Sequence, residues 1–202
     1  MVGFSASAVA DSPDLKVESG ETVLLGPDSQ RFGSLYKRLY PSGIDEVREV
    51  LGLSDAAAKA VRSHNGCRPC AVPSGLVSPD DLDSADKATV RRAKNLAIIA
   101  ATQYVHGAST HPVSQWKPLI DRYLQIGKIA IQYVLLGDID IANGGTLVVS
   151  ASTQALYANN ITIHGSGRIW CKGSLSIKCT TLQGLRNIFL PGVASAAVAK
   201  SV

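Results

Sequence analysis

The chain has 202 residues, of which 46% are hydrophobic, and a formal net charge of +4. A chain of this length can bury a substantial core, and its hydrophobic content excludes a disordered protein. The Lys and Arg residues are scattered and form no stripe that would follow a phosphate backbone, so we expect no nucleic-acid partner.

No apolar run approaches the roughly 18 residues that cross a bilayer, so we expect no membrane span. The first residues, MVGFSASAVADS, contain neither a basic region nor a long apolar region, and they do not read as a secretory signal. We therefore expect a cytoplasmic protein, with export by another route left open. Its four cysteines are compatible with a reducing compartment.

Residues 14–25, DLKVESGETVLL, alternate apolar and polar positions on either side of a Ser-Gly bend. This alternation predicts two short strands whose buried face is formed by Leu15, Val17, Val23 and Leu25. We expect these strands to lie against strands near the C-terminus. The alternative is a hairpin in a separate small domain.

A set of apolar residues follows between two loop-like segments. It predicts one helical turn or a short strand, which either packs onto the domain or offers an aromatic contact surface to a ligand. The set consists of Phe32, Leu35, Tyr36, Leu39 and Tyr40.

The middle of the chain, residues 44–126, is expected to be a mainly helical insertion that covers the strands. Acidic residues after Ile44 favour a helix start there, and Gly52 is expected to break the helix. Ser54 is a suitable N-cap for a second helix.

The clearest helix of the chain is predicted to begin at Ser78, which is a good N-cap and is followed by Pro79 at the first helical position. We expect this helix to run without interruption to Gly107. Another helix is expected from Ser114 to Gly127, with a buried apolar stripe.

The sequence pattern of residues 129–190 predicts the larger group of strands. Two windows there follow one template at a spacing of 22 residues: DIDIANGGTLVV at 138–149 and NITIHGSGRIWC at 160–171. The aligned pairs are Ile139 and Ile161, Ile141 and Ile163, Gly145 and Gly167, Leu147 and Ile169, and Val149 and Cys171. A strand-bend-strand repeat of this length predicts a β-solenoid, whose coils stack their apolar rows on one another. We expect residues 191–202 to be a flexible tail.

The segment NNITIHGSGRIWCKG, residues 159–173, resembles a single coil of the pectin-lyase-like right-handed β-helices, in which an N-I-x-I-x-G-x-G-x-I window recurs. The short period is also similar to that of bactofilins, which are polymer-forming β-solenoids. The resemblance implies the geometry of a coil, and no catalytic residue is carried over from it.

Four cysteines are candidate metal ligands: Cys67, Cys70, Cys171 and Cys179. Cys67 and Cys70 form a C-x-x-C, and thiolates at this spacing can share a zinc ion. However, Cys171 and Cys179 continue the apolar rows of their strands, which is typical of core thiols. We therefore expect no metal site and no cofactor.

Asp138 and Asp140 lie two residues apart on a predicted strand and face the same side, so calcium binding or acid-base chemistry is one interpretation and an ordinary exposed face is the other. No motif of nucleophilic catalysis is present, so we do not expect an enzyme. The candidate ligand-binding residues are Trp170, Tyr157, Tyr133 and His164, because alternation directs the large indole of Trp170 outward.

These patterns predict one α+β domain over residues 1–202: a short β-solenoid or twisted β-sheet, from residues 14–25 and 129–190, with two or three helices packed on it. A stack of few coils leaves unpaired backbone groups at its ends. We therefore expect a non-catalytic structural or interaction module that self-associates into a homo-oligomer. The alternative is a protein that binds a carbohydrate or a cell-surface ligand, including a toxin-like component.

Overall fold

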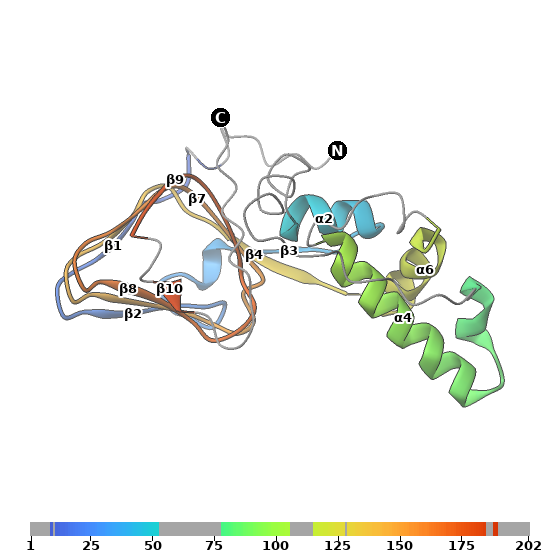
Figure 1. Ribbon diagram of the computed structural model, residues 1–202. Helices are drawn as coiled ribbons and strands as arrows, with labels where there is room; N and C mark the ends of the chain where they lie inside the picture. The colour runs from blue at the N-terminus through green and yellow to red at the C-terminus, as the bar shows by residue number, and fades with distance from the viewer. Residues whose placement is uncertain are drawn as a thin grey trace, which may run out of the picture. The chain divides into compact units, whose positions relative to one another are not determined.

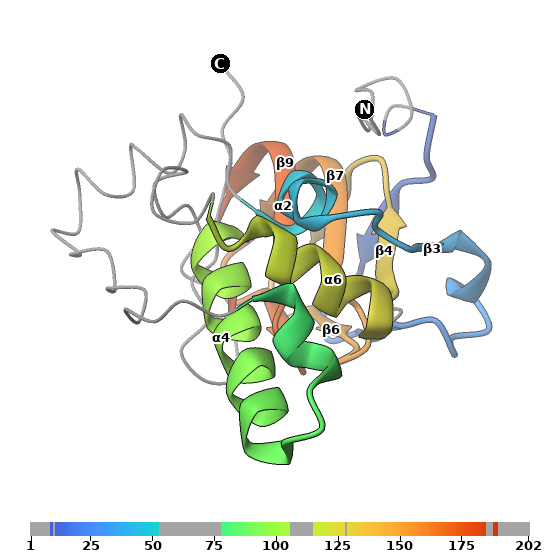
Figure 2. The ribbon, with the colours of Figure 1, turned by 90° about the vertical axis from the view of Figure 1, so that its right-hand side faces the viewer.

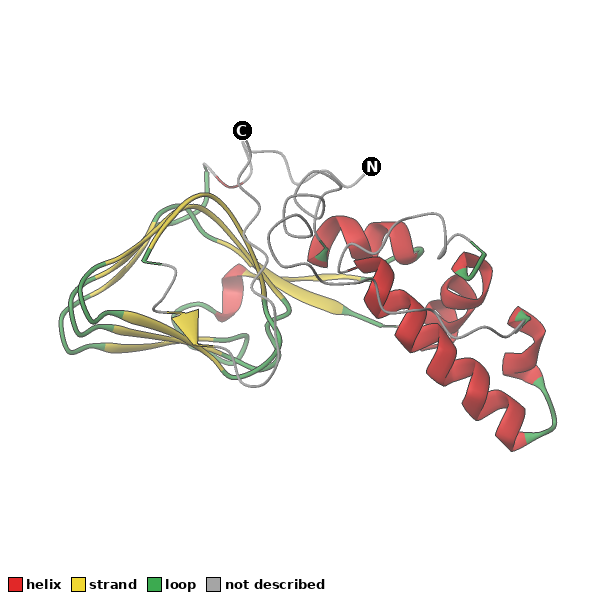
Figure 3. Cartoon of the chain, in the orientation of Figure 1, coloured by secondary structure: helices red, strands yellow, loops and turns green. Residues whose placement is uncertain are grey.

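The computed structural model describes residues 9, 11–52, 78–105, 115–127, 129–184 and 188–189. The chain divides into two compact units. The described helices α2, α4 and α6 belong to the unit that contains residues 40–130. The described strands belong to the unit formed by residues 3–39 and 131–202. The predicted α+β class with a twisted sheet is confirmed (Figure 3). The prediction of one domain stays a prediction.

In its described residues, the helical unit contains three α-helices and a short 3-10 helix. Figure 2 shows how these helices are arranged. They are α2, Ile44–Leu51; η2, Pro79–Asp83; α4, Lys87–Val105; and α6, Lys117–Gly127. As predicted, α2 ends at Gly52, whose N–H donates to Arg48 O. Among the described helices, none combines the length and the apolarity that a membrane span requires.

The expectation of one uninterrupted helix from Ser78 to Gly107 is wrong, because the helical structure is interrupted between η2 and α4. Ser78 caps η2 in a capping box with Asp81. Asp86 then provides a second cap: its carboxylate accepts hydrogen bonds from Ala88 N at 3.1 Å and from Thr89 N at 3.0 Å. A carboxylate that binds these N–H groups begins a new helix, so α4 starts here.

The strand unit contains ten strands among the described residues. They are β1, Leu15–Val17; β2, Thr22–Leu25; β3, Tyr36–Leu39; β4, Ile131–Leu135; β5, Ile139–Ile141; β6, Thr146–Val149; β7, Ala155–Ile163; β8, Arg168–Cys171; β9, Ser176–Gln183; and β10, Ile188–Phe189. A 3-10 turn, η1, spans Gly33–Leu35. Figure 1 looks down the stack, so that successive strands lie one behind another.

The 22-residue repeat is confirmed in the register of the strands. β5 pairs in parallel with β7 so that Ile139 lies beside Ile161, and β6 pairs with β8 so that Leu147 lies beside Ile169. The distant N-terminal copy joins the same stack, because β1 pairs with β5 and β2 with β6. The apolar rows of the three copies form one buried cluster.

The larger sheet curls because β7 is long enough to pair with two different strands. Its first part pairs with β4 and its second part with β5, while β9 follows it along the other side. The sheet order is β1-β5-β7-β4-β3, and the second sheet has the order β10-β8-β6-β2. The two sheets therefore enclose the apolar cluster between them.

Two aligned glycines lie where the backbones of successive repeats approach each other closely. A Cβ added to Gly145 would lie 2.9 Å from Glu18 O, and one added to Gly167 would lie 2.6 Å from Ala142 O. These distances are too short for a side chain. The glycine at this position of the template thus permits the repeats to stack backbone against backbone.

The expected resemblance to the pectin-lyase-like right-handed β-helices and to bactofilins is wrong. β3 joins the larger sheet antiparallel to β4, with Tyr36 beside Val134. The sheet is therefore mixed and curls as a half-barrel, in a chain that also contains a helical unit. The repeat predicted how its own copies pair with one another. It contains no information about β3, which lies outside the repeat and pairs antiparallel.

Candidate functional site

The stack of strands has two different ends, and Figure 2 shows the segment that carries η1 and β3 at one end and β9 at the other. At the first end, the chain leaves β2 and returns through η1 to β3. Phe32 from this segment is buried in the apolar cluster, and Leu35 and Tyr36 pack against it. We call this segment, residues 26–39, the cap.

The cap is held by specific contacts. Tyr36 Oη lies 2.7 Å from Thr153 Oγ1, and the side chain of Thr153 is buried. Burial raises the pKa of Tyr36 to about 12, while the hydrogen bond with Thr153 acts in the opposite direction. Arg31 covers Phe32 from outside, with its Cζ atom 4.9 Å from the ring centroid. The predicted turn or short strand in this segment is confirmed as η1 and β3.

At the other end, β9 pairs only with β7 among the described strands. It has eight residues, and Ile177 and Cys179 direct their side chains into the apolar cluster. Ser176 N donates to Gln154 O, on the side of β7. Among the described residues, the opposite side of β9 is a strand edge, and such an edge carries backbone groups that can bind a further strand.

The outer face of the second sheet carries an apolar row across its strands. β2, β6 and β8 place Leu24, Val148 and Trp170 side by side. Leu24 is 49% exposed and Trp170 is 51% exposed. Trp170 therefore faces outward, as alternation predicted. Arg168 lies beside it, with Cζ 5.8 Å from the indole and Nε donating to Thr146 Oγ1 at 3.0 Å.

The other candidate ligand-binding residues do not gather around Trp170. Tyr133 and Tyr157 lie in the larger sheet and are buried, with ring centroids 6.2 Å apart in an edge-to-face contact. Burial raises the pKa of Tyr133. His164 follows β7 and its Nε2 lies 2.9 Å from Asp140 Oδ1. The four residues thus do not form one site, and their binding roles stay predictions.

A small polar pocket of about 230 Å³ lies on the larger sheet around Asp138. The Asp138 carboxylate accepts hydrogen bonds from Asn159 and Asn160, and Asp138 N donates to the carboxylate of Asp14 at 2.7 Å. These contacts connect the polar groups with one another across neighbouring strands. Within the described part of the chain, no three His, Cys, Asp or Glu side chains are grouped so that they could hold a metal ion.

The cysteines fall into two groups. Cys171 and Cys179 are reduced and buried in the apolar cluster, and burial raises the pKa of each thiol to about 11. A thiol of this kind is protonated and inert at neutral pH. Cys67 and Cys70 lie outside the described residues.

Sequence reasoning missed two features. The edge of β9 gave no signal, because alternation tells which face of a strand is buried and not which strand lies beside it. The second is a run of cations on α4, at Lys87, Arg91 and Lys94, whose spacing of four and three residues was visible in the sequence.

No family model, no curated protein and no solved structure matches the chain. These comparisons therefore assign no family.

Proposed function

We propose that the strand unit is a non-catalytic interaction module that self-associates through the outer edge of β9. The observation that carries this proposal is the difference between the two ends of the stack. At one end the cap packs Phe32 into the apolar cluster, and at the other end β9 is the last described strand of the larger sheet.

The composition of β9 supports the proposal. Edge strands that avoid pairing are commonly short, charged or interrupted by proline. β9 has eight residues, no proline and a single charged residue, Lys178. By comparison, β3 is also an edge strand but has four residues, and two of them are Lys37 and Arg38. β9 is thus the edge best suited to accept another strand.

The cap determines the kind of assembly that we expect. If β9 of one copy paired with β1 of the next, the copies would add head to tail into an open-ended filament. The cap lies at the β1 end of the stack and opposes this pairing. Pairing β9 with β9 of a second copy uses the same surface on both partners and closes with two-fold symmetry. We therefore propose a dimer in which two β9 strands pair antiparallel.

Light scattering coupled to size-exclusion chromatography tests this proposal over a hundredfold range of concentration. We expect the mass to rise from that of a monomer to that of a dimer. Thr180 is exposed on β9, and Thr180→Lys would bring two like charges together in the paired edge. This variant is expected to stay monomeric.

The matched control is Thr22→Lys, which adds the same charge to an exposed position of β2 at the capped end. It is expected to dimerise like the wild type. If Thr22→Lys also abolishes association, the copies join head to tail and the two-fold arrangement is wrong. A monomer at every concentration in the wild type would refute self-association altogether.

A second function is favoured by the exposed row on the outer face of the second sheet. Trp170 offers a flat aromatic surface beside the guanidinium of Arg168, and carbohydrate rings stack on surfaces of this kind. Quenching of Trp170 fluorescence by an oligosaccharide series would support binding. The buried Trp116, which is 4% exposed, supplies an internal reference that should not respond.

A further inference from the structure

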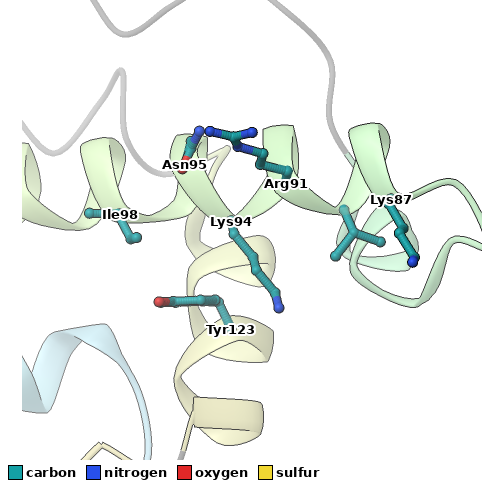
Figure 4. Close-up of a pocket in the computed structure, with 7 residues that line it drawn as sticks. Lys87, Arg91, Lys94, Asn95, Ile98 and Tyr123 are labelled. Carbon is teal, nitrogen blue, oxygen red and sulfur yellow. The ribbon is translucent and has the colours of Figure 1, made fainter.

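The helical unit contains a pocket of about 460 Å³ between α4 and α6. Figure 4 shows the residues that line it, with Lys94 extending from α4 toward α6 and Tyr123 presented by α6. The lining residues are Lys87, Val90, Arg91, Lys94, Asn95, Ile98 and Tyr123. This volume lies within the range of pockets that hold small molecules, about 300 to 1,000 Å³.

Three cations share one face of α4 in this pocket. Lys87, Arg91 and Lys94 are separated by four and three residues, so they follow one another along the helix. The 19 residues of α4 include no Asp or Glu. Like charges at this spacing repel one another and lower helix stability by a few tenths of a kcal/mol per pair. Such an arrangement costs stability and, within the described part of the chain, gains no ion pair in return, which points to a ligand.

Four acidic side chains of the described helical unit, those of Asp45, Asp83, Asp86 and Asp121, are engaged elsewhere. Asp83 binds Arg122 at 2.7 Å, and Asp45 binds Lys117 at 2.8 Å. Asp86 caps α4, and its pKa is lowered by the hydrogen bonds from Thr89 and Ala88.

Asp121 accepts a hydrogen bond from Ile44 N at 2.7 Å. Within the described residues, Lys87, Arg91 and Lys94 form no ion pair with any of these carboxylates. The positive charge of the pocket is therefore not neutralised by this part of the chain.

The remaining lining residues define the rest of the ligand. Val90 and Ile98 contribute apolar surface, and Ile98 is 47% exposed. Tyr123 adds an aromatic ring with a hydroxyl group, and Asn95 adds an amide. A guanidinium binds phosphate oxygens through two parallel hydrogen bonds, and Lys adds point charges. The set fits an anionic group joined to an apolar or aromatic body.

We propose that the pocket between α4 and α6 binds a small phosphorylated molecule, whose phosphate meets Lys87, Arg91 and Lys94 and whose apolar part lies on Val90, Ile98 and Tyr123. The three cations span about 10 Å of helix, from a rise of 1.5 Å per residue. This length suits one or two adjacent phosphates better than an extended polyanion. The proposal concerns the helical unit and does not depend on the edge of β9.

Isothermal titration calorimetry at physiological ionic strength tests the proposal. The full chain is titrated with pyrophosphate, with ATP and with a 20-nucleotide single-stranded DNA. We expect saturable binding of ATP at one site. Arg91→Gln and Lys94→Gln should each weaken it about tenfold or more, because each removes a charged contact. Both positions are exposed, so the variants are expected to fold, which circular dichroism would verify.

Arg92→Gln is the matched control, because Arg92 is an exposed cation of the same helix that does not line the pocket. It should change the affinity for ATP by less than about twofold. If Arg92→Gln weakens binding as much as Arg91→Gln, the contacts are diffuse and the pocket proposal is overturned. Tighter binding of the DNA than of ATP would likewise overturn it.

Two further measurements identify the ligand class. Ile98→Ser should weaken ATP binding and leave pyrophosphate binding unchanged, because only ATP has a body that reaches the apolar surface. Sedimentation with vesicles of phosphatidylcholine and phosphatidylserine distinguishes a lipid headgroup from a soluble phosphate. Binding to ATP without binding to vesicles supports the proposal, and binding to vesicles alone overturns it.

Discussion

The Oδ1 atom of Asn143 accepts two hydrogen bonds from Ser166, one from its backbone N at 2.8 Å and one from its Oγ at 2.9 Å. The two residues lie in the bends of successive repeats. The bend that contains Asn143 is also joined to the bend of the N-terminal copy, because Ser19 Oγ donates to Asn143 O at 2.8 Å. Asn143 thus connects its own bend by hydrogen bonds to the bends that contain Ser19 and Ser166.

Asn143→Ala is expected to lower the free energy of unfolding by about 1 to 2 kcal/mol, since it removes two side-chain hydrogen bonds. Urea denaturation followed by circular dichroism measures this change. Ser166→Ala serves as the partner in a double-mutant cycle. Coupling well above experimental error is expected between the two substitutions, and additive effects would contradict a direct contact.

Gly167→Ala should destabilise the strand unit by roughly 1 to 3 kcal/mol, because the new Cβ would lie 2.6 Å from Ala142 O. Gly20→Ala offers a comparison: its added Cβ meets nothing within 4 Å, although its φ of +75° disfavours a side chain. The two variants separate the crowding between repeats from backbone strain. An equal or smaller loss in Gly167→Ala would contradict the crowding argument.

Phe32→Ala is expected to cost about 3 to 5 kcal/mol, because the ring is buried in the apolar cluster. The substitution should also loosen the packing of the cap at the β1 end of the stack. We expect light scattering to detect species larger than a dimer in this variant, at temperatures where it remains folded. Tyr40→Ala, which removes an aromatic ring that is 63% exposed, is the control and should match the wild type.

The hydroxyl of Tyr36 predicts a specific pH dependence. Burial raises its pKa from 10.0 to about 12, so its contribution to stability is complete below pH 10 and is lost as the pH rises toward 12. Tyr36→Phe loses the hydrogen bond with Thr153 and should be less stable than the wild type at pH 7 by about 1 to 3 kcal/mol.

The stability difference between Tyr36→Phe and the wild type is expected to narrow from pH 9 to pH 12. Chemical denaturation at several pH values measures it. The thiols of Cys171 and Cys179 also titrate late, with pKa values raised to about 11, but they are present in both proteins and cancel in the difference. A difference that does not change with pH would contradict the assigned pKa.

The two tryptophans should be distinguishable by acrylamide quenching. Trp170 is 51% exposed and Trp116 is 4% exposed, so we expect one accessible and one protected component of the emission. Trp170→Phe should remove the accessible component. Because the proposed dimer uses the edge of β9, quenching should not change with protein concentration. A decrease on dimerisation would place the interface on the outer face of the second sheet instead.

The register of the repeats could be predicted from the sequence, because alternation and a fixed period specify both the buried face and the partner position. The pairing of Leu15 with Ile139, far apart in the chain, followed from the same template. The break before α4 could not be predicted from the apolar pattern, because this pattern continues across Ser84 and Asp86. Asp86 binds the first N–H groups of α4, and this local contact outweighs the continuous helical pattern.

The candidate site could be predicted only in part. Alternation correctly directed Trp170 outward, since its neighbours Ile169 and Cys171 are buried. It could not show that Tyr133 and Tyr157 bury their rings against each other, because periodicity within one strand contains no information about contacts between strands. The pocket on α4 likewise depends on the partner helix α6, which no pattern within α4 specifies.

The pairing of β1 with β5 also imposes an order on biosynthesis, because partners such as Asp14 and Asp138 are 124 residues apart. At a translation rate of about 5 to 20 residues per second, the N-terminal strands wait roughly 6 to 25 s for their partners to be synthesised. The helical unit emerges from the ribosome in the meantime and can fold first. Lys16, Glu18 and Glu21 place charges on this segment, and we expect these charges to oppose premature strand pairing while the rest of the chain is being synthesised.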